Sequence, residues 1–364
     1  MRRCEKCLMP DNLPGSDFDA ANVCSWCRTD YPPYEAKGEN ALANKFRGLG
    51  AHGGKADCLV GLSGGKDSTY ALYRLVKHYR LKAEAFIYTH GGSKDFSLRN
   101  ARTSCEKLGV PLHEVSLPAD KHKKAFLHYF RAWLAHPNAV SAGMTCVACK
   151  HLHILGSQIA ARRGIPYVVW SSTPLEYSPF LAIKYTGDKR NPYKRDGMLH
   201  SALQMGREVI RSPKFARGLL AEPHTSIFGC LAVFPNSSYL RFRFPNLTPL
   251  MFYAYEKWDP QLILDTICTE LDWQLPSEIK EDWHTDCVFN IFKEYMFQKM
   301  LGVSYTDAHL SNQVRKGYLT RAEAWQKLLE SKQFYAASLL PALKFLGAED
   351  LIPQIDPGCF EVQA

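Results

Sequence analysis

The feature that most constrains this fold is a run of small and polar residues, Ser63 to Ser68, which reads Ser-Gly-Gly-Lys-Asp-Ser. A short apolar run, 57–62, precedes it, and apolar residues then recur at helical spacing from 71 to 76. The pattern predicts a strand, a glycine-rich turn and a helix, which is the start of an α/β alternation.

This turn has the composition of a phosphate-binding loop. Gly64 and Gly65 let the backbone approach an anion closely and can adopt positive φ angles. The free N–H groups at the start of the next helix, together with the helix dipole, then hold phosphate. Ser63 and Ser68 can donate hydroxyl hydrogen bonds. The loop is not a Walker A sequence, because no Gly-Lys-Ser/Thr ends it.

Two charged residues in the loop are candidate catalytic groups. Lys66 supplies a cation for the phosphates, and Asp67 is placed to hold Mg²⁺ between them. We therefore expect a phosphate-bearing ligand and Mg²⁺ at this loop.

Strands and helices alternate regularly up to residue 170. This alternation predicts a parallel, doubly wound α/β sheet. Tyr88 and Thr89 end the second strand and are expected beside the nucleotide, since ligands bind at the carboxyl ends of such strands. The predicted strands are 57–62, 83–88, 112–117 and 167–170, and the predicted helices are 98–108 and 150–163.

The chain divides into three predicted units. Residues 1–35 are too short and too poor in apolar pattern to form a core alone. Residues 36–250 are the nucleotide-binding domain, with a long insertion at 121–136 and an irregular stretch at 176–250. Residues 251–364 are predicted to be mostly helical.

Four cysteines near the N-terminus have the spacing of a zinc ribbon. Cys4 and Cys7 form one CxxC pair, and Cys24 and Cys27 form another. Two such pairs in a segment too small to fold alone favour structural Zn²⁺. A closed tetrahedral site has no open position, so we assign it to stability and not to catalysis.

A second cysteine group lies in the middle of the chain. Cys146 and Cys149 precede the predicted helix 150–163 and are expected at the same rim as the phosphate loop. A thiolate at a helix N-terminus has a lowered pKa and is a good nucleophile or metal ligand. With Cys230, three thiolates could hold an iron–sulfur cluster of the 4Fe-4S type with one open iron. Alternatively the pair carries a persulfide or is structural, and Cys230 is a core cysteine.

The other cysteines and the histidines are predicted to be structural. The His-rich stretch 113–136 has no tidy ligand spacing and is interpreted as a solvated face. His151 and His153 flank the cysteine pair and could support it. The cysteines predicted to be in the core are Cys58, Cys105, Cys268, Cys287 and Cys359.

Composition excludes disordered and membrane-spanning classes. The chain is 46% hydrophobic and 22% charged, and no apolar run approaches the roughly 18 residues that span a bilayer. No secretory signal follows Met1, so we expect a cytoplasmic protein with no membrane partner. The formal charge of +9 favours polyanionic partners such as a nucleotide, a phosphate-bearing small molecule or nucleic acid.

Two local patterns carry further predictions. Cations and aromatics alternate in Arg241-Phe-Arg-Phe244, as on base-stacking surfaces, but the alternation favours a strand with one solvated face. Thr320-Arg-Ala-Glu323 has the signature of a capping box at the start of a helix.

The loop at 63–68 resembles the SGGxDS loop of the N-type ATP pyrophosphatase (PP-loop, adenine nucleotide alpha hydrolase) superfamily. The resemblance implies that ATP is split between its α and β phosphates, giving pyrophosphate and an adenylated substrate. Lys66 and the loop amides would stabilise charge on the leaving pyrophosphate.

Two terminal segments resemble one family within this superfamily. Cys4-Glu-Lys-Cys7-Leu-Met-Pro-Asp11 and Cys24-Ser-Trp-Cys27 are similar to the opening of the N-acetyl sugar amidotransferases of lipopolysaccharide biosynthesis. Residues 310–324 are similar to their C-terminal region. The resemblance implies that ammonia, delivered by a separate glutaminase and its channel-forming partner, replaces the adenylated oxygen.

The segment Thr145-Cys146-Val-Ala-Cys149-Lys150 resembles instead the tRNA thiolation enzymes of the same superfamily. In those enzymes a mid-domain CxxC and a later cysteine bind a cluster that carries sulfur, which implies Cys230 as the third ligand. The chain departs from them at 171–176, where they carry Gly-His and paired acidic residues, and it lacks their C-terminal zinc ribbon.

Three enzymatic functions follow. The leading hypothesis is adenylation of a small molecule or nucleobase followed by sulfur insertion, with a sulfur donor as partner. The alternatives are amidation of a nucleotide sugar, with a glutaminase partner, and thiolation of tRNA. A binding module with an inactive nucleotide fold is disfavoured by the intact Lys66 and Asp67.

Overall fold

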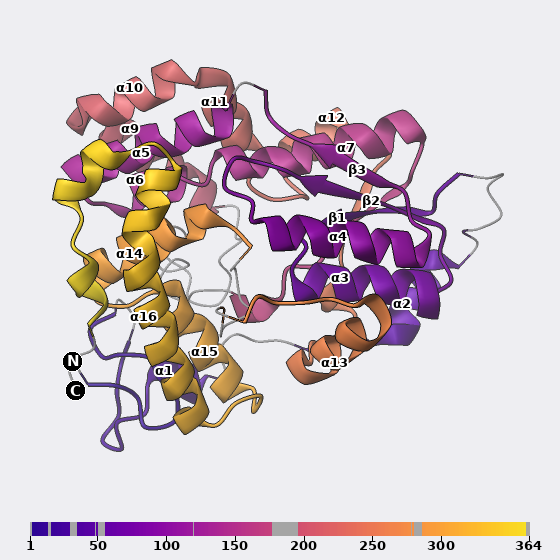
Figure 1. Ribbon diagram of the computed structural model, residues 1–364, viewed down its shortest axis with the longest axis horizontal. Coiled ribbons are helices and arrows are strands. Elements are labelled where there is room, and N and C mark those ends of the chain that lie inside the picture. Colours follow the sequence, from indigo (N-terminus) through magenta and orange to yellow (C-terminus); the bar gives the residue numbers. More distant parts are fainter. Residues whose placement is uncertain are drawn as a thin grey trace.

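The computed structural model describes residues 2–13, 16–29, 35–47, 49, 55–118, 120–176, 196–277, 279 and 286–361. They form a parallel α/β sheet, an N-terminal segment with four clustered cysteines, and a helical C-terminal region (Figure 1). The predicted fold class is confirmed. Part of the predicted irregular stretch, 177–195, lies outside the described residues.

The central sheet has five strands in the order β3-β2-β1-β4-β5, and all of its pairings are parallel. In the middle strand, Val60 pairs with Ala85 of β2 and with Val169 of β4. The middle strand is apolar along its length because helices cover both faces of the sheet. The strands are β1 (Cys58–Leu62), β2 (Ala83–Tyr88), β3 (Leu112–Val115), β4 (Tyr167–Trp170) and β5 (Thr248–Met251).

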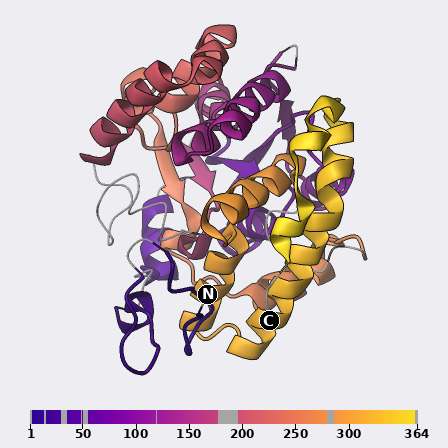
Figure 2. The ribbon, with the colours of Figure 1, turned by 90° about the vertical axis from the view of Figure 1, so that its left-hand side faces the viewer.

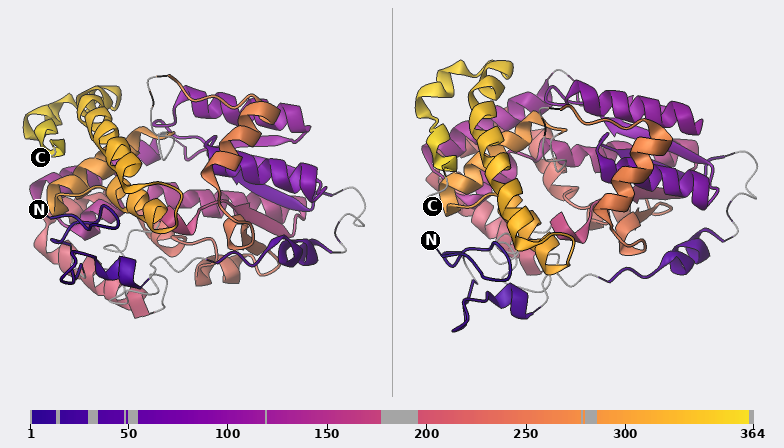
Figure 3. Two further views of the ribbon diagram at one scale, coloured as in Figure 1. Left: turned by 90° about the horizontal axis from the view of Figure 1, so that it is seen from below. Right: turned by 60° about the horizontal axis from the view of Figure 1, so that its bottom comes forward.

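Helices lie on the two faces of this sheet, as the views from different sides show (Figures 1 and 3). α3 (Lys66–Tyr73), α4 (Asp95–Leu108) and α13 (Pro260–Leu271) pack together on one face and share a core with the strands. α7 (His151–Arg163) packs on β1 and β4 from the other face. Because α13 comes from the C-terminal third of the chain, that third helps to build the core of the α/β sheet.

A helical region lies beside the sheet (Figures 1 and 2). Its core is aromatic and joins α5 (Lys121–Ala135), α14 (Val288–Leu301) and α16 (Arg321–Phe345). The predicted insertion at 121–136 therefore forms a core helix, and the predicted helical character beyond 255 is confirmed. The remaining elements are α1 (Ser25–Arg28), α2 (Glu39–Phe46), η1 (Arg74–His78), α6 (Ala139–Met144), η2 (Ala148–Lys150), η3 (Pro174–Glu176), η4 (Phe252–Ala254), α15 (Tyr305–Arg315), η5 (Glu349–Gln354) and η6 (Pro357–Phe360).

The stretch 176–250 was predicted to be irregular, and this was wrong for its described part. Pro213 and Pro223 occupy the first turns of two helices, where the missing N–H of proline costs no helical hydrogen bond. Ser212 caps the first of them by accepting a hydrogen bond from the Phe215 N–H. The prolines thus begin helices instead of breaking them. The helices are α9 (Asp196–Arg211), α10 (Pro213–Ala221), α11 (Pro223–Leu231) and α12 (Ser238–Arg243).

Of the two predictions made from local sequence patterns, one was wrong and one is confirmed. The alternation at Arg241–Phe244 was predicted to form a strand but lies at the end of α12, which the Ser237 hydroxyl caps. Four alternating residues are too few to outweigh such a helix start. The capping box is confirmed, since the side chains of Thr320 and Glu323 each accept a hydrogen bond from the other's N–H. No helix of the described ranges is both long and apolar enough to cross a membrane.

The N-terminal segment obtains its core from the C-terminal helices (Figure 2). Leu8 is fully buried against Leu310 of α15 and Leu328 of α16. The Arg321 guanidinium donates hydrogen bonds to the carbonyls of Cys4 and Cys7, at 3.1 and 3.2 Å. A segment too short to fold alone is thus stabilised by residues roughly 300 positions later in the chain.

We predict that the buried ion pair between this segment and α15 contributes strongly to stability. Arg3 Nη1 lies 2.7 Å from Asp307 Oδ1, and both side chains are buried. Arg3→Ala would leave the buried carboxylate without this partner and is expected to cost about 3–5 kcal/mol in unfolding free energy. The measurement is chemical denaturation of the purified variant.

The matched control is Arg2→Ala. Arg2 forms an ion pair with Asp11 at 3.0 Å, but its side chain is 70% exposed, so the loss is expected to stay within about 1 kcal/mol. Equal effects of the two substitutions would contradict the assignment.

Candidate active site and metal centre

The predicted phosphate loop lies where the strand order reverses. In the order β3-β2-β1-β4-β5, the strands that follow β1 in sequence, β2 and β3, lie on one side of it. β4 and β5 then lie on its other side. A crevice at the carboxyl ends of two such strands is the usual ligand site of an open α/β sheet. The loop 63–68 follows β1 and residues 171–176 follow β4, so both segments border this crevice.

Close packing explains why the loop needs glycine. Gly64 has a φ of +79°, which side chains rarely adopt. A Cβ at this position would lie 1.9 Å from the carbonyl oxygen of Ser97 in α4. The tight approach of α4 to the loop therefore depends on this glycine.

The two loop serines hold the turn itself. Ser68 Oγ accepts a hydrogen bond from the Ser63 N–H at 3.1 Å and donates one to the Gly65 carbonyl at 3.2 Å. Ser63 Oγ accepts from the Gly65 N–H at 3.2 Å. These bonds keep the backbone curved at the start of α3. The predicted donation of these hydroxyls to phosphate stays a prediction.

Aromatic side chains from the region after β5 hold the loop from outside. Trp258 Nε1 donates to Asp67 Oδ1 at 2.7 Å, and the Tyr253 hydroxyl donates to the Asp67 carbonyl at 3.1 Å. Trp273 Nε1 donates to the Gly64 carbonyl at 2.9 Å. All three aromatic residues are buried. They were missed from the sequence, because a tryptophan in a helical region reads as core.

The predicted catalytic lysine is held near the same carboxylate. Lys66 is buried, with Nζ 3.9 Å from Asp67 Oδ2 and 5.8 Å from the Trp258 ring centroid. Its positive charge therefore faces the carboxylate that is expected to hold Mg²⁺.

Two acidic residues from other segments, Glu176 and Asp286, lie near the loop. Burial and the neighbouring Asp67 raise the pKa of Glu176 to about 8, although Lys66 opposes this. Burial also raises the pKa of Asp286, against a hydrogen bond from Ser63. At neutral pH Glu176 is therefore mostly protonated and can give a proton to a reacting group. The sequence assigned a role to neither residue.

Tyr88 and Thr89, which end β2 and were predicted beside the nucleotide, have different surroundings. The Tyr88 hydroxyl lies 3.0 Å from His122 Nδ1 in the interior. Thr89 is held by β3, since its N–H donates to the Val115 carbonyl at 2.7 Å, and it lines a pocket of about 440 Å³. The other residues of this pocket are His90, Gly91, Ser116, Leu117, Pro118, Asp120, His122 and Lys123.

The mid-domain cysteine pair lies on the turn between α6 and α7. Cys149 Sγ is 3.5 Å from His122 Nε2. Burial, and then the neighbouring Cys146, raise the pKa of the Cys149 thiol to about 12. The expected lowering at a helix N-terminus is therefore wrong for Cys149, because desolvation outweighs the helix dipole. The prediction of a solvated His-rich face also fails at His122, which is 3% exposed.

The later cysteines have different positions from those predicted. Cys230 points its thiol at Met144 Sδ, 3.7 Å away, in an apolar cluster. Cys287 was predicted to be core, but its Sγ lies 3.8 Å from His90 Nε2, and its thiol interacts electrostatically with Cys149 and Cys146. Cys268 was also predicted to be core and is exposed.

The two histidines that flank the pair have structural contacts. His151 Nε2 lies 3.0 Å from the Thr225 carbonyl, and His153 Nδ1 lies 2.6 Å from the Ala232 carbonyl. Burial lowers the pKa of both rings. As neutral donors they tie α7 to α11 and the residue after it.

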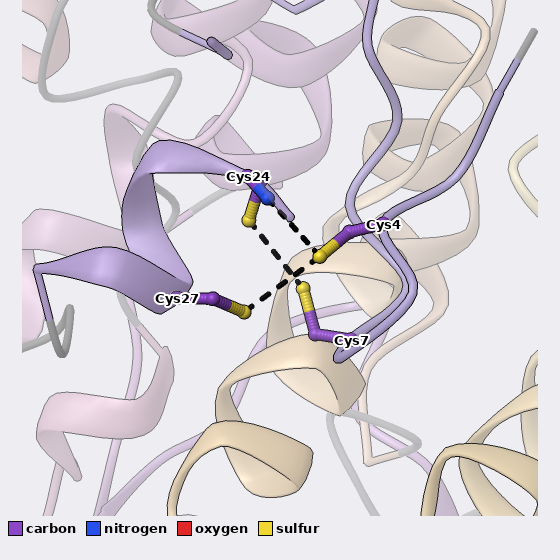
Figure 4. Close-up of side chains that lie close together, drawn as sticks. All are labelled: Cys4, Cys7, Cys24 and Cys27. Carbon is purple, nitrogen blue, oxygen red and sulfur yellow. Dashed lines mark hydrogen bonds between the residues drawn. The ribbon is translucent and has the colours of Figure 1, made fainter. Parts of the chain in front are cut away.

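The N-terminal cysteines come together in the cluster that their spacing predicts, and this cluster could hold a metal ion (Figure 4). Cys4, Cys7, Cys24 and Cys27 bring their sulfurs within 4.8 Å of one another. The contacts Cys4–Cys27 and Cys7–Cys24 measure 3.8 and 3.7 Å. A tetrahedron with Zn–S bonds of about 2.3 Å has edges of about 3.8 Å, so the set fits Zn²⁺.

No protein-family model matches this chain, and no curated protein matches its sequence. Among solved structures, an NMN synthetase from Francisella tularensis is similar at 12% sequence identity with a TM-score of 0.36. The match covers 82% of this chain and 92% of that chain.

We predict that the four-cysteine centre binds about one Zn²⁺ per chain. Cys24→Ser should abolish this zinc and lower the stability of the N-terminal segment, because zinc binding contributes folding energy. The measurements are metal content and limited proteolysis of the segment. Cys268→Ser, at an exposed position, is the control and should change neither. Full zinc retention by the Cys24 variant would contradict the assignment.

A second prediction concerns the indole that holds Asp67. Trp258→Phe removes a hydrogen bond to a carboxylate, worth about 1.5–3 kcal/mol. If Asp67 acts in the reaction, pyrophosphate release from ATP should fall by about 10- to 100-fold. Trp325→Phe, on α16, is the control. Normal turnover of the Trp258 variant at every Mg²⁺ concentration would show that this contact does not position a reacting group.

Proposed function

We propose that this protein is an ATP-dependent enzyme that adenylates a substrate oxygen and then replaces that oxygen with sulfur. The observation that carries the proposal is the loop Ser63–Ser68 at the strand-order reversal, with three cysteine thiols near the same rim. The acceptor oxygen would bond to the α-phosphorus of ATP while pyrophosphate leaves. Sulfur would then bond to the acceptor carbon, and AMP would leave with the oxygen.

The residues after β4 support a polar ligand in the crevice. Ser171 follows β4 directly, and its Oγ is buried and has no hydrogen-bond partner among the residues that the structure describes. Buried polar groups are usually paired, so this hydroxyl fits a ligand with acceptor oxygens. Lys66 and the loop amides would stabilise the leaving pyrophosphate, and Asp67 would hold Mg²⁺.

The incoming atom is the finer part of the proposal. Cys146 and Cys149 lie at this rim, with Lys293 and Asp286 close enough to influence the Cys149 thiol. Ammonia chemistry does not require these thiols, whereas sulfur transfer does. We therefore place the sulfur there, with a small molecule or nucleobase as acceptor and a separate sulfur donor as partner. The reducing cytoplasm keeps such thiols unpaired.

Amidation by partner-delivered ammonia is the second candidate, and one contact favours it. The two segments that resemble the sugar amidotransferases pack against each other, since Arg321 binds the carbonyls of Cys4 and Cys7. A nucleotide sugar would then be the acceptor and a glutaminase the partner. Thiolation of tRNA ranks third, because residues 171–176 depart from the Gly-His and paired acidic residues that those enzymes carry.

We predict that Lys66→Met and Asp67→Asn each lower pyrophosphate release from ATP by at least about 100-fold, because both remove stabilisation of the transition state. The assay follows AMP and pyrophosphate in the presence of candidate acceptors. Lys299→Met is the control, since Lys299 forms an ion pair with Asp356 at a position that is 43% exposed. Undiminished release, or ADP and phosphate as products, would refute the proposed reaction.

The donor atom is tested with the same assay. Wild-type protein receives sulfide in one reaction and ammonia in another, and the mass of the modified acceptor is measured. A thio product supports the main proposal, and an amidine product supports the second candidate.

A further inference from the structure

We propose that Cys287, and not Cys230, is the third cysteine of an iron–sulfur site that also contains Cys146 and Cys149. This inference rests on the proposed function only for the role of the site, since metal binding itself is testable without turnover. Two independent features support it: the path of the chain around Cys287, and the paired arrangement of thiols and imidazoles.

The chain brings Cys287 to the loop that follows β2. Cys287 forms an antiparallel bridge with Ser93. On either side, the Lys94 N–H donates to the Asp286 carbonyl at 3.0 Å, and the Val288 N–H donates to the Gly92 carbonyl at 2.8 Å. This short ladder fixes Cys287 at the carboxyl end of β2, beside the nucleotide loop.

Two cysteine–histidine pairs meet at this place. Cys149 Sγ is 3.5 Å from His122 Nε2, and Cys287 Sγ is 3.8 Å from His90 Nε2. The centroids of the two imidazole rings are 4.5 Å apart. The pairs therefore form one cluster, although their cysteines are more than 130 residues apart in sequence.

The hydrogen bonds of His90 define its role. The ring Nδ1 of His90 accepts a hydrogen bond from the Gly92 N–H at 3.1 Å, so Nδ1 carries no proton and the ring proton is on Nε2. That N–H points at Cys287 Sγ, so His90 is a donor to the sulfur and not itself a ligand. Such a donor stabilises a metal-bound thiolate.

Charge compensation explains why three thiols would bind a metal centre. A soft metal centre replaces the thiol protons and compensates the negative charge of the thiolates.

The metal centre that we propose is a cluster and not a single ion. Across the described ranges, only the N-terminal cysteines have three or more ligand atoms all within 4.8 Å of one another. One zinc ion requires that close spacing. In an iron–sulfur cluster each cysteine binds a different iron, so the sulfurs stand farther apart. Three cysteines leave one iron of a 4Fe-4S cluster without a protein thiolate.

Cys230 has the surroundings of a packing residue. Its thiol contacts Met144 Sδ at 3.7 Å within an apolar cluster that includes Tyr129 and Phe215. Burial alone accounts for the raised pKa of its thiol, to about 11. It therefore serves as the matched control in the test of the site.

The experiment measures metal binding by full-length protein. Wild type, Cys287→Ser, Cys287→Ala and Cys230→Ser are reconstituted anaerobically with ferrous iron and sulfide. Iron, acid-labile sulfide and zinc per chain are then measured together with the visible absorption spectrum. Zinc and circular dichroism report whether the N-terminal centre and the fold are intact.

We expect wild type and Cys230→Ser to hold the cluster. The two Cys287 variants should remain folded but lose most of the cluster's iron and visible absorption. Three results would overturn the inference: no iron in wild type, zinc in place of iron, or cluster loss on replacing Cys230 with retention on replacing Cys287. Lys66→Met separates the two proposals, because it should keep its iron while losing pyrophosphate release. Iron binding by a wild type that does not turn over ATP would refute the proposed function alone.

Discussion

The conformation of the predicted phosphate loop depends on hydrogen bonds from indole and phenol groups that lie between 186 and 209 residues later in the chain. Trp273 binds the carbonyl of Gly64, and Trp258 binds the carboxylate of Asp67. Gly64 in turn lies so close to α4 that any side chain would collide with it. A strand, two helices and the segment after β5 must therefore be in place before the loop has its shape. This requirement couples folding of the C-terminal third to formation of the predicted phosphate loop.

Helix α14 connects the two cysteine sites of the molecule. Cys287 is the residue that precedes its first turn. At its other end, Phe297 packs in the same apolar cluster as the N-terminal cysteines. α14 therefore links the packing of the four-cysteine segment to the position of Cys287.

Signals within a few residues were predictable from the sequence, and long-range convergence was not. Each of three features was predictable from residues close together in the sequence: the loop 63–68, the four-cysteine spacing and the capping box at Thr320. The parallel sheet was predictable from the alternation of strands and helices along the chain. The helices at Pro213 and Pro223 were missed because proline marks both a helix start and a break. Cys287 was missed because the signal lies in its pairing with Ser93, which no local pattern indicates. The same reasoning explains why Cys230 was favoured: it follows the CxxC pair in sequence, but its thiol contacts Met144 instead.

The charges around the crevice indicate how a nucleotide must arrive. Asp67, Glu176 and Asp286 lie near the loop, with Lys66, Lys94 and Lys293 opposing them. A triphosphate adds several negative charges at this place, and these would raise the carboxyl pKa values further or repel the ligand. A divalent cation that bridges Asp67 and the phosphates removes this conflict, because it replaces repulsion between like charges with coordination. In the proposed reaction, Mg²⁺ would therefore enter together with the triphosphate, whichever atom later displaces AMP.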